Sequence, residues 1–418
     1  MKHSCLDVTS NLITINKSQE SQNTCNSLEK RCFLLAVPVE LQTKIFVYAQ
    51  NPAMALVSRH FQNLAQSSLL KAKYLIHRYG HEAALSERSM RRKIASYSVI
   101  ECLLKQHGCD PTADEFWLYK HACQTHQVDV CIWIIETVVA AKLSDMGSLL
   151  SMAAAYGAVD IVDILVENYH VDVHQPNGDE LALQVATLYN QTHLVKHLCE
   201  KYNCNLHVDN ESALRSAAFN GFSSLVEYFI NKGANVHAFN NASLASAVHQ
   251  GHSSVVELLL KSGASARIHN NFCARYAVLR RQDIAILKHL ILLGDVNPRF
   301  DDDWMLLQAC KKGFVEILKF LLTDIMANEI DSIVNMKDGI LLKKAILYKQ
   351  LSVIRLLVSL GADVNSHGCI SGLCSLLSTQ DRSRIIKDIV KLLVDKGFDI
   401  SRQSNSIQYS IMQILGQI

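Results

Sequence analysis

Two stretches of the sequence, Gly221 to Asn235 (GFSSLVEYFINKGAN) and Gly251 to Ala264 (GHSSVVELLLKSGA), follow one pattern. Each opens with Gly, carries an element of the form apolar-apolar-x-x-apolar-apolar, and closes on Gly-Ala. The spacing of that element places its apolar side chains on one face of a helix. Because Gly adopts left-handed geometry without a Cβ penalty, it can end a helix at this point. The pattern therefore predicts a short helix held between two tight turns.

The same register continues on both sides of these stretches. The first apolar residue of the element, which we call the marker, recurs at intervals of 30 to 36 residues. Self-similarity at such a period is typical of repeat proteins. The marker column consists of Val99, Val130, Ile161, Leu194, Leu225, Val255, Ile286, Ile317, Val353 and Ile389.

A column of alanines precedes the markers by about eight residues and predicts a second helix in each unit. A small residue at this position allows that helix to lie close against its neighbour. A single helix pair cannot bury both of its apolar faces, whereas a stack of pairs can. The column consists of Ala122, Ala153, Ala186, Ala217, Ala247, Ala277, Ala309 and Ala345.

These residues resemble ankyrin repeats over about Glu82 to Ile400, in about ten divergent copies. The resemblance implies an all-α solenoid of stacked helix-turn-helix units, with an array at 82–400 and a capping helix at 401–418. The first helix lacks the Thr-Pro-Leu-His start of the family and opens with versions such as Ser212-Ala213-Leu214. The two 36-residue spacings predict insertions near 323–335 and 378–383, as loops or lengthened helices.

A separate module precedes the array. Its apolar residues Leu41, Ile45 and Phe46 fall on one face of a helix that Pro38 can open. Together with Val57-Ser58-Arg59-His60-Phe61 this segment resembles an F-box, although Val37 replaces Leu and the Leu-Asp pair is missing. The resemblance implies a helical module at 31–66 that docks on the adaptor of a cullin-type ubiquitin ligase. The adaptor-binding residues it implies are Pro38, Leu41, Ile45, Phe46, Val57 and Phe61. The alternative is that residues 31–80, including a linker helix at 67–81, only cap the first repeat.

The overall composition favours a soluble protein without a nucleic-acid or membrane partner. The 418 residues carry 41 Lys and Arg against 39 Asp and Glu, a net charge of +2. The polar tail at 1–30 has no apolar core of a secretory signal and is expected to be disordered. We expect a cytoplasmic monomer, with the nucleus as a second compartment. In a reducing compartment the 13 cysteines, none in a CxxC pair, should be free thiols.

Few residues suggest catalysis or metal binding. His193 and His197 lie four residues apart on a predicted helix, but no third ligand is spaced nearby, so ordinary helix positions are the better interpretation. No GxSxG, P-loop or GxGxxG sequence occurs. We therefore expect a protein that is not an enzyme and needs no cofactor or metal. The run Arg88, Arg91, Arg92 and Lys93 could be a nuclear-import or nucleic-acid patch, but such a run is more often a solvated helix face.

The most variable columns are the two residues before the turn between helices. In ankyrin proteins these positions face the concave groove, and aromatic and Arg side chains there often dominate binding. The predicted groove residues are Tyr156, Tyr189, Phe219, Asn220, His249, Gln250, Arg280, Lys311, Lys312 and Tyr348. The alternative is that these columns are simply exposed.

Two functions follow as hypotheses. In the first, the chain is the substrate-recognition subunit of a ubiquitin ligase, with an adaptor and cullin at the N-terminal module and a protein target in the groove. In the second, it is a plain ankyrin scaffold or inhibitor. An enzyme is a distant third.

Overall fold

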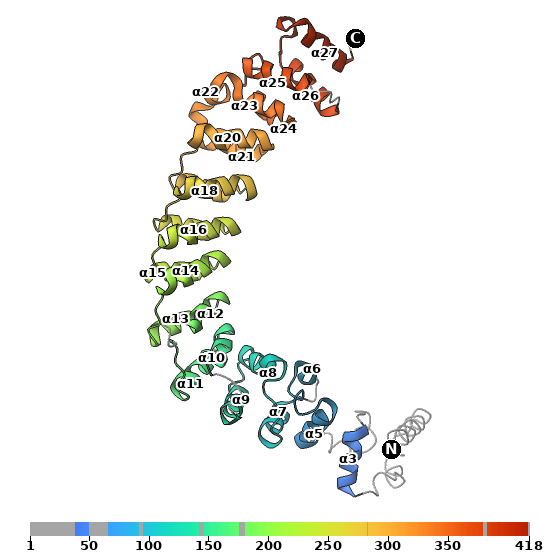
Figure 1. Ribbon diagram of the computed structural model, residues 1–418, viewed down its shortest axis with the longest axis vertical. Helices are drawn as coiled ribbons and strands as arrows, with labels where there is room; N and C mark the ends of the chain where they lie inside the picture. Colours follow the sequence, from blue (N-terminus) through green and yellow to red (C-terminus); the bar gives the residue numbers. More distant parts are fainter. Residues whose placement is uncertain are drawn as a thin grey trace, which may run out of the picture. The chain divides into compact units, whose positions relative to one another are not determined.

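The computed structural model describes residues 38–49, 66–91, 95–141, 146–174, 180–281, 283–378 and 383–416. Within these ranges every regular element is a helix, which confirms the prediction of an all-α protein (Figure 1). The chain divides into two compact units, residues 1–204 and 205–418. Each unit is described below by itself. The predicted tail at 1–30 and the residues Val57 and Phe61 lie outside the described ranges.

Unit 1 holds the N-terminal helices and the first repeats. Its helices are α3 (Val39–Ala49), α5 (Ser68–Tyr79), α6 (Glu87–Met90), α7 (Tyr97–Glu101), the π-helix η4 (Cys102–Gln106), α8 (Ala113–Gln124), α9 (Val128–Ala141), α10 (Met146–Ala155), α11 (Val159–Glu167), α12 (Leu181–Leu188) and α13 (Thr192–Lys201).

Unit 2 holds the remaining repeats. Its helices are α14 (Val208–Asn220), α15 (Ser223–Asn231), α16 (Ala238–Gln250), α17 (Ser253–Lys261), α18 (Ile268–Tyr276), η5 (Ala277–Arg281), α19 (Ile284–Leu292), α20 (Phe300–Lys312), α21 (Val315–Lys319), η6 (Phe320–Ile325), η7 (Ala327–Glu329), α22 (Ile330–Val334), α23 (Met336–Leu347), α24 (Leu351–Ser359), α25 (His367–Leu377), α26 (Arg384–Asp395), η8 (Ile400–Arg402) and α27 (Asn405–Leu415).

The helices of unit 2 form two layers. The first helices of successive repeats contact one another in the order α14, α16, α18, and the second helices do so in the order α15, α17, α19. Within a repeat the two helices also contact each other, as α14 does with α15. Each helix is covered on one side by the other helix of its repeat. The uncovered surfaces of the two layers therefore face opposite directions.

The core lies between the layers. Every member of the alanine column is completely buried, and every marker residue is at most 2% exposed. Both columns predicted from the sequence therefore pack as expected. All ten markers lie on helices.

Several first helices of unit 2 open with three residues in left-handed geometry. In α14 these are Asp209, Asn210 and Glu211, with φ between 48° and 61°. The equivalent residues in α20 are Asp301, Asp302 and Asp303. Left-handed geometry costs most residues about 1–2 kcal/mol each, and Asn, Asp and Gly tolerate it best. This turn directly precedes Ser212-Ala213-Leu214, and it explains why Asn and Asp gather there.

One glycine has a different role from the glycines that end helices. Gly294 follows α19, but its neighbour Asp295 adopts the left-handed geometry there, with φ 51°. A Cβ at Gly294 would lie 2.7 Å from the Cβ of Ala266. Gly294 is therefore needed for close packing.

The two predicted insertions take different forms. The first is occupied by η6, η7 and the short helix α22. Near the second, α26 begins five residues before its marker Ile389, whereas α15 begins two residues before Leu225. This helix is lengthened at its start, and residues 379–382 lie outside the described ranges.

We predict that Leu259→Ala lowers the free energy of unfolding by about 2–5 kcal/mol, because it leaves a cavity between repeats. Leu259 on α17 is completely buried. Leu292→Ala is the matched control, because Leu292 on α19 is 59% exposed, and it should change stability by less than about 0.5 kcal/mol. Urea denaturation followed by circular dichroism measures both. Equal costs for the two variants would mean that α17 does not face the core.

Candidate functional site

The predicted groove residues divide between the two units. Tyr156 and Tyr189 lie in unit 1, where Tyr156 is half-buried and Tyr189 is 59% exposed. The other eight lie in unit 2, at the ends of α14, α16, η5, α20 and α23. All eight are exposed or half-exposed, as a binding surface requires. The unit 2 residues can be analysed as one surface because their helices stack directly.

We call the outward surface of these helices the first-helix face. It consists of five equivalent columns of exposed or half-exposed side chains. Their positions are 212, 215, 216, 219 and 220 in α14, 242, 245, 246, 249 and 250 in α16, 272, 275, 276, 279 and 280 in α18 and η5, 304, 307, 308, 311 and 312 in α20, and 340, 343, 344, 347 and 348 at α23.

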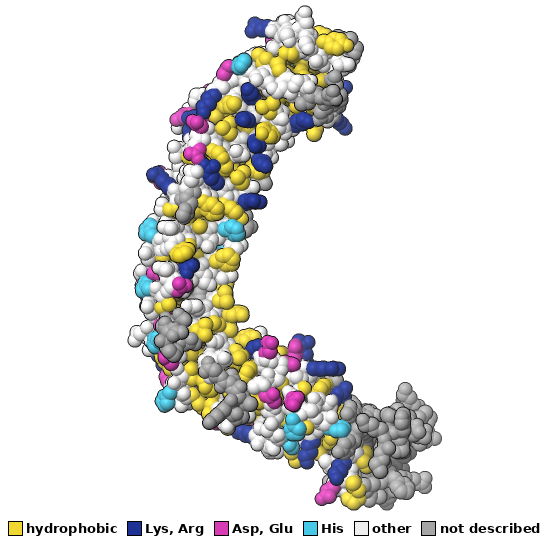
Figure 2. All heavy atoms as spheres, in the orientation of Figure 1, with side chains coloured by type: hydrophobic (Ala, Val, Ile, Leu, Met, Phe, Trp, Pro, Cys, Tyr) yellow, Lys and Arg dark blue, Asp and Glu magenta, His cyan; other side chains and the backbone are white. Residues whose placement is uncertain are grey.

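The charges on this face are all of one sign. None of the 25 positions is Asp or Glu. Figure 2 shows Lys and Arg side chains gathered over the α20 to α24 region, and hydrophobic ones on the edge along α14 to α18. The seven basic residues of the face are Arg215, Arg275, Arg280, Lys311, Lys312, Lys343 and Lys344.

Two of these cations brace one repeat against the next. Arg215 donates hydrogen bonds to the carbonyl oxygens of Asp209 and Asn210 and lies 5.3 Å from the ring centroid of Phe239. The Phe239 ring belongs to the opening turn of the following repeat. Both contacts tie up the guanidinium, so Arg215 is not a free binding group.

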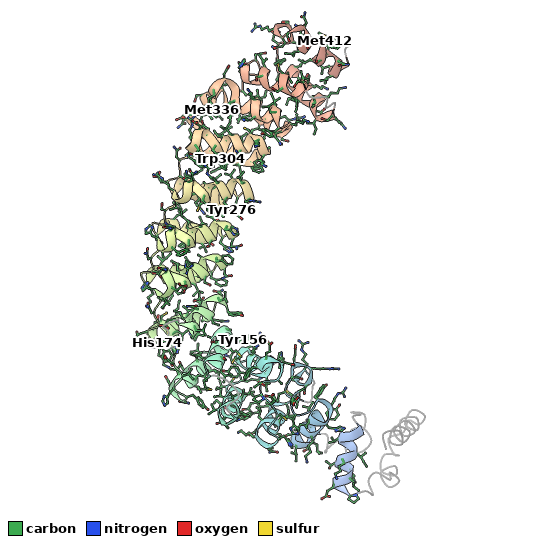
Figure 3. The ribbon with its side chains drawn as sticks, in the orientation of Figure 1. Tyr156, His174, Tyr276, Trp304, Met336 and Met412 are labelled. Carbon is green, nitrogen blue, oxygen red and sulfur yellow. The ribbon has the colours of Figure 1, made fainter. Side chains whose placement is uncertain are left out.

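Arg275 acts in the same way one step along the stack. It pairs with Asp301 and lies 4.5 Å from the ring centroid of Trp304, which Figure 3 shows on α20. The sequence did not predict the contacts of these two arginines, because both lie four or five residues before the variable columns. The sequence feature that could have predicted these contacts is the recurrence of Arg at the equivalent positions 215 and 275.

The remaining cations are available to a partner. Arg280, Lys312, Lys343 and Lys344 have no ion-pair partner among the described residues, and Arg280 and Lys312 are exposed. Lys311 is half-buried and lies 5.0 Å from the ring centroid of Tyr348. Lys311 and Lys312 also fall in the last turn of α20, where a positive charge stabilises the helix dipole. Lys311 and Lys312 can still attract a negatively charged partner while they stabilise the helix dipole.

Acidic side chains stand at the opposite ends of the same helices. Asp209, Asp301, Asp302 and Asp338 lie in the opening turns and are exposed. Beside the first-helix face, the opening turns of α14 and α20 are therefore acidic, those of α16 and α18 contain no Asp or Glu, and η5 and α20 end in basic residues.

Aromatic and apolar side chains complete the face. Phe219 is 49% exposed and Leu279 is 38% exposed, at equivalent positions on α14 and η5. Between them the His249 ring lies 4.8 Å from that of Tyr276. Figure 3 labels Tyr276 at the right-hand end of the α18 region.

The residues predicted to bind an adaptor are partly described. Pro38 and Leu41 are exposed, Leu41 at 48%, and Ile45 is half-buried on α3. Phe46 belongs to α3, but its side chain lies outside the described part, as do Val57 and Phe61. Helix α3 packs against α5 beside a cleft of about 790 Å³ whose lining includes Val47, Leu70 and His107.

One cluster in unit 1 has the composition of a metal site. His174, Glu180 and Cys204 place their ligand atoms within 4.8 Å of one another. However, His174 Nδ1 lies 2.9 Å from Glu180 Oε1, and the next repeat has the same pair, with His207 Nδ1 2.7 Å from Glu211 Oε1. The recurring pair indicates a structural role in the turn.

The protonation states also disfavour a metal. Burial raises the pKa of the Cys204 thiol well above its usual value, and the hydrogen bond to Glu180 raises it further. The hydrogen bond to Glu180 raises the pKa of His174. A metal requires the thiolate and the neutral imidazole, so both shifts oppose binding.

The other residues considered from the sequence are accounted for by local pairs. His197 Nε2 lies 2.7 Å from Asp163 Oδ1, while His193 is exposed. Arg91 pairs with Glu87, Arg88 is exposed, and Arg92 and Lys93 lie outside the described ranges. The ten described cysteines are free thiols, as expected. None of the described helices is long and apolar enough to cross a membrane.

Comparison with known families identifies the repeats. Residues 181–270 and 275–367 match the family model described as ankyrin repeats (3 copies). These two stretches are ankyrin repeats. Both matched stretches lie within the predicted array at 82–400, and the count of ten copies stays a prediction. Ankyrin repeats are protein-interaction modules, which supports a protein-interaction role for these stretches.

The other comparisons are less informative. Residues 37–66 match a model described as the YDR249C N-terminal domain, so the F-box interpretation stays a prediction. No curated protein matches the chain. Among solved structures, the human ASB11 ankyrin repeat domain is 17% identical, and the match covers 56% of this chain and 96% of that chain at a TM-score of 0.25.

We predict that neither a chelator nor added Zn²⁺ shifts the melting temperature, because the cluster around Glu180 is held by hydrogen bonds. Cys204→Ala should change stability by less than about 1 kcal/mol, since Ala234 and Ala264 occupy the equivalent positions in the next repeats. Thermal unfolding with and without EDTA measures this. A shift of several degrees that Cys204→Ala abolishes would establish a metal site.

Proposed function

We propose that this chain is a substrate-recognition subunit of a cullin-type ubiquitin ligase. In this proposal the module at 31–66 docks on the ligase adaptor, and the ankyrin array holds the target protein. The groove of the array would then supply the specificity, while the ligase supplies the chemistry. The proposal extends the protein-interaction role of the repeats to a particular assembly.

The observation that supports a docking role is the way the N-terminal helices pack. Helix α5 contacts α7 and η4 of the first repeat, and it buries Leu70, Ala72 and Leu75. A solenoid needs such a cover over its terminal apolar surface. Helix α3 packs on α5, one layer further out. Helix α5 therefore covers the first repeat without α3, and capping alone does not explain why the chain carries the module at 31–66.

The exposed side chains of α3 also suit a partner. Leu41 keeps 48% of its surface exposed although it is apolar, and Pro38 is exposed beside it. The cleft between α3 and α5 shows that the two helices are not tightly closed on each other. An adaptor could bury this surface without disturbing the array.

We predict that deleting residues 31–66 removes adaptor and cullin from the proteins that co-purify with the full chain, while target binding persists. Leu41→Asp should do the same without a deletion, because Leu41 is half-exposed and tolerates a polar residue. Affinity purification with quantitative mass spectrometry measures both effects.

Leu292→Asp serves as the matched control, since Leu292 is a similarly exposed leucine on α19 in unit 2. It should leave adaptor recovery unchanged. If the full chain recovers no adaptor and the deletion makes the array insoluble, the module is a cap and the chain is a plain ankyrin scaffold or inhibitor.

A further inference from the structure

We infer that the first-helix face recognises an extended protein segment of about 12 residues that is apolar in one half and rich in Asp and Glu in the other. The inference rests on the proposed role of the array as the target-binding part. It adds to that role the chemistry of the segment.

The order of side chains along one edge of the face carries this inference. At the ends of the first helices the edge begins with Phe219 on α14 and His249 on α16. It continues with Leu279 and Arg280 on η5, and then with Lys311 and Lys312 on α20. The edge therefore changes from apolar and aromatic to cationic at η5. At α23 it ends on Leu347 and Tyr348, and the Tyr348 ring lies 5.0 Å from the Lys311 ammonium.

The cationic half calls for a partner of opposite charge. Arg280 and Lys312 are exposed at equivalent positions on neighbouring repeats, and Lys343 and Lys344 follow on α23. Packed helices lie about 8–10 Å apart, close to the Debye length of about 8 Å at physiological salt, so these charges act together on a nearby carboxylate. Because the face offers no carboxylate of its own, a bound segment must supply it.

The cations at the helix ends determine which edge the segment follows. At the start of α20, Asp301 pairs with Arg275 and Asp302 with Lys337, so the charges of that edge largely compensate each other. Arg280 and Lys312 at the other edge have no ion-pair partner among the described residues and attract an acidic segment. A chain with a negative charge on every unit, such as a nucleic acid, gains nothing from the apolar half.

The apolar half provides an anchor for hydrophobic side chains. Phe219 and Leu279 are partly exposed, and the ring of Tyr276 is held against that of His249. Between them α16 presents small side chains, Ala245 and Ser246, on the same face. Burying such apolar and aromatic surface supplies affinity that the charges alone would not.

The length of the segment follows from the number of repeats. The edge from α14 to α23 covers four repeat steps. At about 10 Å for each step it is roughly 40 Å long, which an extended chain of about 12 residues spans at about 3.3 Å per residue.

The test selects 12-residue peptides from a random phage library on the full chain. We expect the selected sequences to gather Asp and Glu in one half and Leu, Phe, Tyr or Trp in the other. A selected peptide should bind Arg280→Glu/Lys312→Glu at least about tenfold more weakly in fluorescence anisotropy, with slower association and a smaller loss of affinity at high salt.

Lys288→Glu/Lys319→Glu is the matched control, because it makes the same charge change at exposed positions on the second helices α19 and α21. It should leave peptide binding within about twofold of the original protein. Phe219→Ser tests the apolar half and should weaken the same peptide about tenfold or more.

Three results would overturn the inference. They are a selected pool that keeps the composition of the library, equal weakening by both double variants, and tighter binding of a single-stranded oligonucleotide than of the selected peptide. None of these measurements involves residues 31–66. A failure here therefore leaves adaptor recovery unaffected, and loss of adaptor recovery alone would leave this inference standing.

Discussion

The close approach of successive first helices is the constraint on which the rest of the structure depends. It is possible because an alanine stands at the contact in eight of the first helices, and each of these alanines is completely buried. A larger side chain there would force the helices apart, since well-packed cores do not absorb extra methylenes without strain. The regular stacking brings equivalent positions of neighbouring repeats into register. Single residues such as Arg280 and Lys312 thereby become parts of one surface.

Polar contacts in the turns keep that register. Asn241 Oδ1 accepts a hydrogen bond from the backbone nitrogen of Ser265 at 2.8 Å, and Asn335 Oδ1 accepts one from Asp363 at the same distance. Each bond joins the turn of one repeat to the turn of the next. Loss of either acceptor would leave a backbone N–H without its partner, which is costly when the group is buried. The turns are thus fixed before any partner arrives, and a preorganised surface loses less entropy on binding.

The sequence predicted the packing of the array more completely than its surface. The marker and alanine columns could be found because burial repeats with the period of the fold, so every copy carries the same signal. The role of Gly294 could not, because it depends on Ala266 in the preceding repeat, 2.7 Å from where a Cβ would stand. The left-handed opening turns were also missed, although Asn and Asp gather at Asp209, Asn210 and the equivalent positions. The family's Thr-Pro-Leu-His start corresponds to Ser212-Ala213-Leu214, after these turn residues, and gave no reason to expect left-handed geometry before it.

The distinction between bracing and free cations shows why surface function is harder to infer than fold. Arg275 and Arg280 lie five residues apart on one continuous helix, and both are basic residues on the same face. Their roles differ because Asp301 and Trp304 of the following repeat hold Arg275, while Arg280 lies beyond their reach at the helix end. Composition alone would count both as binding charges. Only the neighbouring repeat decides which charge stabilises the stack and which is available to a partner, so the cations at the helix ends can change with little effect on the fold, whereas the braces cannot.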